Sequence, residues 1–451
     1  MINFLELNHA ARVSLASEIH SRPFLKLAAP ELVTHLAIYA EAEDALRGGC
    51  LPAQHALLAS LCAHFGVASA ALDAKYFYYD FGSFRLKWEC HAEFATYTFA
   101  RAFQESLDSG VDFEACIAHM PIKEIPETWL RQLQGKILVA AHVILERSKS
   151  SHEALAQQLQ SLFKTHTLAG SRVMQGGEFW SDFMIHADGF SRFLVRDLGM
   201  RSQQAGRLVQ RILEIETYRM MALLGLPYAQ RATSHLNAIE NELAQLAAKM
   251  VDADFALREQ DFDSDGASDR ELLEQITRLA ARMEKLSLEN NYRFSASQAY
   301  FGLVHARIDE LREVRLEGVP MLVEFMDRRL TPAMNTCNAM ANRQDALARR
   351  IAHSNELLST RVGIVQEAQN RKILQSMNNR ADHQLRLQQA VEGLSVVAIS
   401  YYAVGLFGYL SKGAKDLGWI AHADSVIGAF VPIVLGAVWL GLRHLHRKMR
   451  R

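Results

Sequence analysis

Two long uncharged stretches near the end of the chain constrain its fold more than any other feature. Residues 393–411 and 425–442 contain no Asp, Glu, Lys, Arg or His. A helix rises 1.5 Å per residue, so each stretch would form a helix of about 27–29 Å, close to the ~30 Å hydrocarbon core of a bilayer. The sequence therefore predicts a two-helix transmembrane hairpin at 393–442, with the lipid bilayer as its partner.

The charges around these stretches predict the orientation of the hairpin. The loop at 411–424 contains two lysines and two aspartates, whereas the tail at 443–451 contains five Lys or Arg residues. Segments rich in Lys and Arg stay on the cytoplasmic side. We therefore expect a basic cytoplasmic tail and, because two spans return the chain to the same side, a cytoplasmic N-terminus. The first residues lack the basic and apolar pattern of a signal peptide.

Composition argues against some classes of partner. The 451 residues include 49 Lys and Arg against 50 Asp and Glu, whereas nucleic-acid binders usually carry a basic excess. No nucleic acid is expected. The five cysteines are scattered without a Cys-x-x-Cys pair, which favours reduced thiols over disulfides or a zinc site.

Hydrophobic patterns divide the chain before the hairpin into three regions. Residues 1–200 alternate between strand-like and helix-like segments, which predicts an α+β cytosolic domain with a mixed or antiparallel sheet covered by helices. Helices are expected at 9–19 and 52–64, and strands at 34–39, 81–89, 93–99, 136–145, 172–175, 178–186 and 191–195.

Residues 201–330 have the period of helices. Two apolar stripes with 3-4 spacing predict an antiparallel coiled-coil arm or a helical bundle: Leu236, Ile239, Leu243, Leu246 and Met250, then Leu272, Ile276, Leu279, Met283 and Leu286. A further helix is expected to start near Ser295 and to end at Gly318 and Pro320.

A long stalk helix is predicted over residues 331–392. Thr331 and Pro332 suit an N-cap and a first helical position, and no proline follows before Pro432, so the helix could continue into the first span. Its apolar stripe at Leu347, Ile351, Leu358 and Val365 is diluted by polar residues. A half-polar helix of this length needs neighbours, and self-association as a homo-oligomer would supply them.

The segment 87–94 carries the most concentrated set of chemically active side chains. Read as one strand, it places Glu89, His91 and Glu93 on one face and Trp88 and Phe94 on the other. Two carboxylates and a histidine could serve acid–base chemistry or bind a metal. The alternative is a solvated or salt-bridged sheet face.

Two further polar groups have plain structural alternatives. His186 and Asp188 would share a face of an extended segment, but Asp188-Gly189 is also a turn signal. His20 and Arg22 could bind an anion or cap the end of a helix.

The acidic segment 261–266 resembles the start of a calcium loop but lacks its bidentate glutamate, because Leu272 stands at that position. An acidic turn is expected there, and no metal site is predicted. Phosphate-loop, dinucleotide, zinc-protease and nucleophile-elbow motifs are absent, so the sequence identifies neither a cofactor nor a catalytic activity.

Five segments resemble a bacterial family of uncharacterised membrane-anchored proteins, the domain of unknown function 3422. They are EIHSRPF at 18–24, FRLKWECHAEFATYTF at 84–99, IHADGFSRFLV at 185–195, EIETYRMMALLGLP at 214–227 and EGLSVVAISYYAVGLFGYL at 392–410. The resemblance covers nearly the whole chain and implies no established activity. It implies a bacterial membrane-anchored protein, and with the two predicted spans we expect it in the inner membrane.

In architecture alone, the chain also looks like the CorA-type magnesium channels. Those channels carry Gly-Met-Asn after the first span, whereas this chain reads Gly408-Tyr409-Leu410. The leading hypothesis is a homo-oligomeric scaffold or binding head on a membrane anchor. The second is a divergent channel for a divalent cation, with a pore lined by Ser395, Ser400, Tyr402, Gly405 and Gly408. The third is a metal-assisted enzyme that uses Glu89, His91 and Glu93 with His186.

Overall fold

The computed structural model describes residues 8–13, 15–16, 23–40, 51–103, 113–133, 135–147, 152–163, 167–173, 176–259, 267–416 and 423–449. The chain divides into two compact units. The first comprises residues 1–251 and 276–353, and the second comprises 252–275 and 354–451. Each unit is described by itself.

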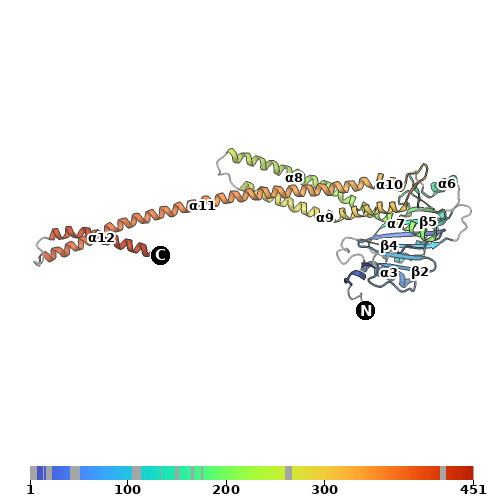
Figure 1. Ribbon diagram of the computed structural model, residues 1–451, viewed down its shortest axis with the longest axis horizontal. Helices are drawn as coiled ribbons and strands as arrows, with labels where there is room; N and C mark the ends of the chain where they lie inside the picture. The colour runs from blue at the N-terminus through green and yellow to red at the C-terminus, as the bar shows by residue number, and fades with distance from the viewer. Residues whose placement is uncertain are drawn as a thin grey trace. The chain divides into compact units, whose positions relative to one another are not determined.

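A mixed sheet forms the centre of the first unit, as predicted (Figure 1). Its nine described strands lie in the order β2-β3-β4-β1-β5-β8-β7-β6-β9. β5 and β8 are parallel, and the other neighbouring pairs are antiparallel. The strands are β1 Glu31–Tyr39, β2 Tyr76–Asp80, β3 Arg85–Cys90, β4 Phe94–Ala102, β5 Lys136–Glu146, β6 Ala169–Val173, β7 Gly177–Ser181, β8 Ser191–Asp197 and β9 Val314–Arg315.

Both faces of this sheet are buried, so β1 carries buried apolar side chains on both of its faces. Val33 and Ala37 point to the face covered by helix α7 (Ser202–Leu223), and Leu36 and Ile38 point to the opposite face. That opposite face is covered by α3 (Leu51–His64) and α5 (Glu127–Leu130), and farther along the sheet by α4 (Phe113–Ala118) and α6 (His152–Phe163). A short 3-10 helix, η2, spans Pro121–Glu124.

The segment 87–94 is not one strand, so that prediction is wrong. β3 ends at Cys90 and β4 begins at Phe94, and the N–H of His91 donates to the carbonyl oxygen of Phe94 at 2.8 Å. Ala92 and Glu93 thus form a tight hairpin turn. The turn resets the alternation of the side chains, so Phe94 lies on the face of Glu89 and not on that of Trp88. Similarly, β7 ends at Ser181, well before His186.

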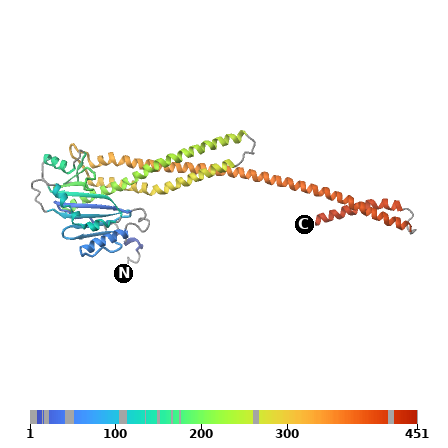
Figure 2. The same ribbon diagram turned by 180° about the vertical axis from the view of Figure 1, so that it is seen from behind.

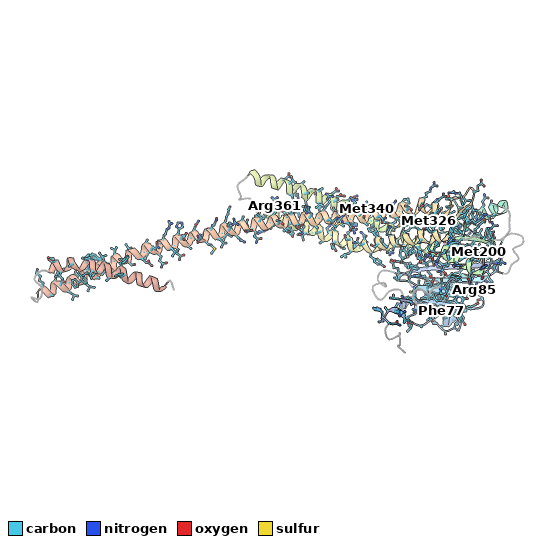
Figure 3. The ribbon with its side chains drawn as sticks, in the orientation of Figure 1. Phe77, Arg85, Met200, Met326, Met340 and Arg361 are labelled. Carbon is cyan, nitrogen blue, oxygen red and sulfur yellow. The ribbon has the colours of Figure 1, made fainter. Side chains whose placement is uncertain are left out.

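Parts of three long helices, residues 225–251, 276–311 and 331–353, form a bundle beside the sheet within the first unit (Figures 1 and 2). They are α8 (Gly225–Glu259), α9 (Ala267–Leu311) and the first part of α11 (Thr331–Asp416), and the short α10 (Leu322–Arg329) precedes α11. The Arg343 guanidinium donates to Asn237 on α8 at 2.7 Å, and the Gln344 amide donates to Asn291 on α9 at 2.7 Å. Thr233 on α8 donates to the sulfur of Met340 on α11 at 3.3 Å (Figure 3).

The apolar stripes predicted for this region are largely buried. Nine of the ten residues named for the two stripes are in the core: Leu236, Ile239, Leu243, Leu246, Leu272, Ile276, Leu279, Met283 and Leu286. The expected helix start near Ser295 is wrong, because α9 continues through it to Leu311. α11 does begin at Thr331, but the Thr331 hydroxyl has no hydrogen-bond partner and does not act as a cap.

The second unit contains the end of α8, the start of α9, the remainder of α11 and helix α12 (Ala423–Met449). The rings of Phe407 and Phe430 stack with centroids 3.6 Å apart, so α12 packs back along α11. α11 and α12 each contain a window long and apolar enough to cross a membrane. At the other end of the unit, Arg361 on α11 pairs with Asp269 on α9, with Nε and Oδ2 2.8 Å apart.

Candidate functional site

A cavity of about 320 Å³ lies between the sheet and helix α7. Its floor comes from β1, β3 and β4, its roof from α7, and part of its rim from Arg307 on α9. All of these elements belong to the first unit. The volume is at the lower end of the range for small-molecule sites.

A close contact at the start of α7 fixes the roof over the floor. Gly206 faces the segment before β1, where an added Cβ would lie 1.7 Å from the carbonyl oxygen of Leu25. The N–H of Leu27 donates to the carbonyl oxygen of Ser202 at 3.3 Å. Only a residue without a side chain allows this approach.

His35 on β1 is held in one tautomer in the floor. The Thr217 hydroxyl donates to the carbonyl oxygen of Leu213 at 2.8 Å, so it can only accept from His35 Nε2, 3.2 Å away. Nδ1 then accepts from the Thr98 hydroxyl at 2.8 Å. Burial, followed by electrostatic interactions with Lys87 and His91, lowers the pKa of His35 to about 3. The imidazole is therefore neutral at physiological pH.

Lys87 on β3 is a buried cation in the same floor. Its ammonium lies 3.0 Å from the Glu89 carboxylate and donates to the Gln210 amide oxygen on α7 at 3.0 Å. In the register of β3 and β4, Lys87 is opposite Thr98 and Glu89 is opposite Thr96. The floor is thus a row of charged and hydroxyl groups beneath a polar stretch of helix.

Glu214 is the centre of a charged cluster at the rim. Its carboxylate accepts from Gln210 at 2.7 Å, from Arg211 at 2.8 Å and from Arg307 at 2.5 Å. Burial alone would raise the pKa of Glu214, but the Gln210 hydrogen bond and the two guanidiniums outweigh it and lower the pKa. Glu310 on α9 pairs with Arg211 at 2.5 Å, which completes the network.

The Thr96 hydroxyl is the unusual group in the cavity wall. Its side chain is on β4, the residue is 4% exposed, and its oxygen has no hydrogen-bond partner within the described structure. A buried hydroxyl without a partner is costly. Because Thr96 lines the cavity, a bound molecule could supply the missing hydrogen bond.

The structure divides the predicted set of Glu89, His91 and Glu93. Glu89 and His91 line the cavity, and the His91 ring stacks on Phe94 with centroids 4.4 Å apart. Glu93 is in the hairpin turn, where its carboxylate forms a buried ion pair with Arg293 on α9. For Glu93, the salt-bridged alternative is the one that the structure supports.

The second predicted pair also has structural roles. Asp188 accepts from the N–H of Phe190 at 3.1 Å and pairs with Arg192 at 2.9 Å, in a turn where Gly189 has a φ of +85°. His186 Nε2 lies 3.2 Å from the Asp182 carboxylate. The turn chemistry expected at Asp188-Gly189 is thus present.

The enzyme hypothesis requires His91 and His186 to lie close together, and the structure places them far apart. His91 follows β3 and His186 lies between β7 and β8, and four strand spacings separate β3 from β8. At about 4.8 Å per strand, this separation is roughly 19 Å. Among the described residues, no group of three His, Cys, Asp or Glu side chains could hold a metal ion. His20, Arg22 and the acidic segment 261–266 lie outside the described residues.

Sequence reasoning missed most of the cavity. His35, Lys87, Glu214 and Arg307 come from four parts of the chain that only the fold brings together. A local signal was nevertheless present, since a histidine and a lysine within buried strands require polar partners.

The proposed pore residues do not share one face of α11. Ser400 is buried, and Gly408 lies beside Ile427 of α12, whose Cδ1 is 3.8 Å from the position of an added Cβ. Tyr402 is 69% exposed, and the Ser395 hydroxyl donates to the carbonyl oxygen of Val391 at 2.9 Å. Nothing lies within 4 Å of an added Cβ at Gly405. The channel alternative gains no support from this arrangement.

Comparisons with known proteins address the whole chain. A search of curated proteins found no match. Among solved structures, the full-length CmaX protein is similar with 12% identity and a TM-score of 0.17, over 68% of this chain and 89% of that chain. The family described as "Protein of unknown function (DUF3422)" matches residues 7–449, in agreement with the resemblance seen in the sequence. The chain therefore belongs to the DUF3422 family of proteins of unknown function.

Proposed function

We propose that this protein is a membrane-anchored binding protein, with its ligand site in the cavity beneath α7. The observation that carries the proposal is the polar lining of the cavity of about 320 Å³, where the buried Lys87–Glu89 pair, a partly buried charged network at the rim and the unpartnered Thr96 hydroxyl lie together. Burial of polar side chains is costly unless they are hydrogen-bonded or paired. A site for a polar ligand accounts for their concentration here.

The chemistry of the lining favours binding over catalysis. His35 has both ring nitrogens in hydrogen bonds, and its pKa of about 3 makes it a weak general base near neutral pH. Glu214 and Lys87 are held in ion pairs. These groups are arranged to hold a molecule in place.

The two apolar helix segments supply the proposed anchor. They lie at 393–411 of α11 and 425–442 of α12, with no charged side chain in either. We propose that they form a transmembrane hairpin in the inner membrane, with both termini in the cytoplasm as the basic tail favours.

Self-association is supported by the part of α11 that precedes the first apolar segment. Many large apolar side chains between residues 357 and 391 are more than half exposed. They are Leu357, Ile364, Ile373, Leu374, Met377, Leu385, Leu387 and Val391. Exposed apolar side chains of this number favour association, so we propose a homo-oligomer that is held together along this segment.

Native mass spectrometry of the full-length protein, released from mild detergent, tests the binding role. We expect a small-molecule adduct on the wild-type protein. The adduct should be lost in Thr96→Leu, which replaces the hydroxyl with a larger apolar side chain in the cavity, and kept in Thr331→Leu, which alters an unpartnered hydroxyl outside the cavity lining. An adduct that survives Thr96→Leu would place the ligand elsewhere.

A further inference from the structure

We infer that the cavity beneath α7 binds a small polyhydroxylated compound without net charge, of the monosaccharide or cyclitol class. This inference rests on the proposed binding function and specifies its ligand. It follows from three observations on the lining: its charges are already paired, its unmet hydrogen-bonding capacity is a hydroxyl, and aromatic rings lie beside the polar groups.

The charges of the lining leave no counter-ion for a charged ligand. Lys87 is paired with Glu89, and Glu214 is shared by Arg211 and Arg307. The two arginines also pair with Glu310. A phosphate, carboxylate or ammonium group that entered would have to break one of these pairs or remain uncompensated, and both are unfavourable in a buried site.

The unmet hydrogen-bonding capacity suits an alcohol. The Thr96 hydroxyl can donate one hydrogen bond and accept two, and none is made within the described structure. Glu89 stands directly opposite it in the strand register, so a ligand hydroxyl could donate to the carboxylate while a neighbouring hydroxyl bonds to Thr96. Adjacent hydroxyls of this kind are what a sugar or cyclitol presents.

The remaining wall offers an apolar surface of suitable size. Phe94 and Tyr218 line the cavity together with Leu25, Leu27 and Val209. A mixture of aromatic and aliphatic side chains with a few fixed polar groups is typical of small-ligand sites. The C–H faces of a sugar ring can pack on such a surface while its hydroxyls face the polar floor.

The variant Thr96→Val tests this assignment without removing any hydrogen bond of the unliganded protein. Valine has the shape of threonine but lacks the unpartnered hydroxyl, so the variant should fold as the wild type does. Thr331→Val is the matched control, because its hydroxyl is also unpartnered but lies outside the cavity lining.

The experiment measures binding to full-length protein in detergent by isothermal titration calorimetry. The probes are two matched pairs, myo-inositol with myo-inositol 1-phosphate and D-glucose with D-glucose 6-phosphate. We expect at least one uncharged probe to bind more tightly than its phosphate. Its affinity should fall about threefold to tenfold in Thr96→Val, the loss of one neutral hydrogen bond, and should not change in Thr331→Val.

Two results would overturn the inference, with different consequences for the proposed function. If only the phosphorylated probes bind and Thr96→Val weakens them, the ligand is anionic, and the binding head stands while the ligand class is wrong. If no probe binds and the native adduct of the wild-type protein is also absent, both the ligand class and the binding role are wrong.

Discussion

Two buried histidines lie within the sheet and depend on threonine partners. His35 bonds to Thr98 and Thr217, and His142 Nδ1 lies 3.0 Å from the Thr34 hydroxyl. The His142 ring also stacks on Phe190 at 3.9 Å between centroids. Burial is the largest cause that lowers the pKa of each to about 3. Both side chains are therefore held in their neutral form.

From these two histidines we predict that the sheet domain loses stability at a higher pH than the one at which its carboxylates take up protons. A histidine in the unfolded chain takes up a proton near pH 6.5, whereas these do so near pH 3 in the folded state. Their stabilising contribution is complete above pH 6.5 and is lost as the pH falls toward 3. Each histidine should lower the free energy of unfolding by about 2 kcal/mol between pH 7 and pH 5.

Urea unfolding at pH 7 and pH 5, followed by tryptophan fluorescence, measures this loss. The variant His35→Gln should be less stable than wild type at pH 7 but should lose less free energy of unfolding between the two pH values. An unchanged pH dependence in both His35→Gln and His142→Gln would show that neither histidine is neutral in the fold.

At the scale of elements, the β3–β4 turn is fixed to helix α9 by one buried ion pair. Glu93 in the turn and Arg293 on α9 are both almost fully buried, and the guanidinium lies 5.6 Å from the ring centre of Tyr292. The N–H of Ala40 donates to the carbonyl oxygen of Glu93 at 2.9 Å, which ties the end of β1 to the same turn.

Removal of one partner of the Glu93–Arg293 pair should lower the free energy of unfolding more than removal of both partners. Arg293→Met leaves the Glu93 carboxylate buried without a counter-charge and should lower the free energy of unfolding by about 3–5 kcal/mol. The double variant Glu93→Gln, Arg293→Met should recover much of that loss. Chemical unfolding of the single and double variants checks this, and equal losses in Arg293→Met and the double variant would contradict it.

The contact between α7 and the segment before β1 yields a second prediction at this scale. Gly206→Ala places a methyl group 1.7 Å from the Leu25 carbonyl oxygen, so α7 must shift and the cavity roof with it. We expect a loss of about 1–3 kcal/mol from this overpacking. Gly302→Ala on α9 is the matched control, because nothing lies within 4 Å of its added Cβ, and it should be neutral or slightly stabilising. Thermal unfolding compares the two variants, and equal stability would contradict the tight contact.

The hydrophobic patterns in the sequence predicted which helices and strands are present better than they predicted where each one begins and ends. The buried apolar residues of β1 and the apolar stripes of α8 and α9 are direct consequences of burial, so they can be read from the sequence. The turn at Ala92-Glu93 has no glycine, proline or asparagine to mark it. The cavity could not be predicted, because it depends on how α7 and Arg307 meet the strands, which are far away in the chain.

At the scale of the whole molecule, the structure changes where self-association should be sought. Leu347 and Ile351, part of the stripe expected to need neighbours, are 2% and 1% exposed within the single chain. Ile373 and Leu374 are 58% and 66% exposed. The first pair stabilises the protein's own fold, and the second is available to another copy.

These two pairs should respond differently to substitution. The double variant Ile373→Asp, Leu374→Asp should remain folded and yield a smaller species in detergent, whereas Leu347→Asp, Ile351→Asp should lose helical signal because it buries charges in the core. Size-exclusion chromatography with light scattering and circular dichroism make the comparison. A wild-type monomer in mild detergent would contradict the proposed oligomer.

Fractionation of cell extracts tests the membrane anchor most directly. The full-length protein should sediment with membranes, resist alkaline carbonate extraction and be released only by detergent. Leu394→Arg with Val397→Arg, within the first apolar segment, should increase the extractable fraction, whereas Leu357→Arg, outside it, should not. Recovery of the wild-type protein in the detergent-free supernatant would contradict the account.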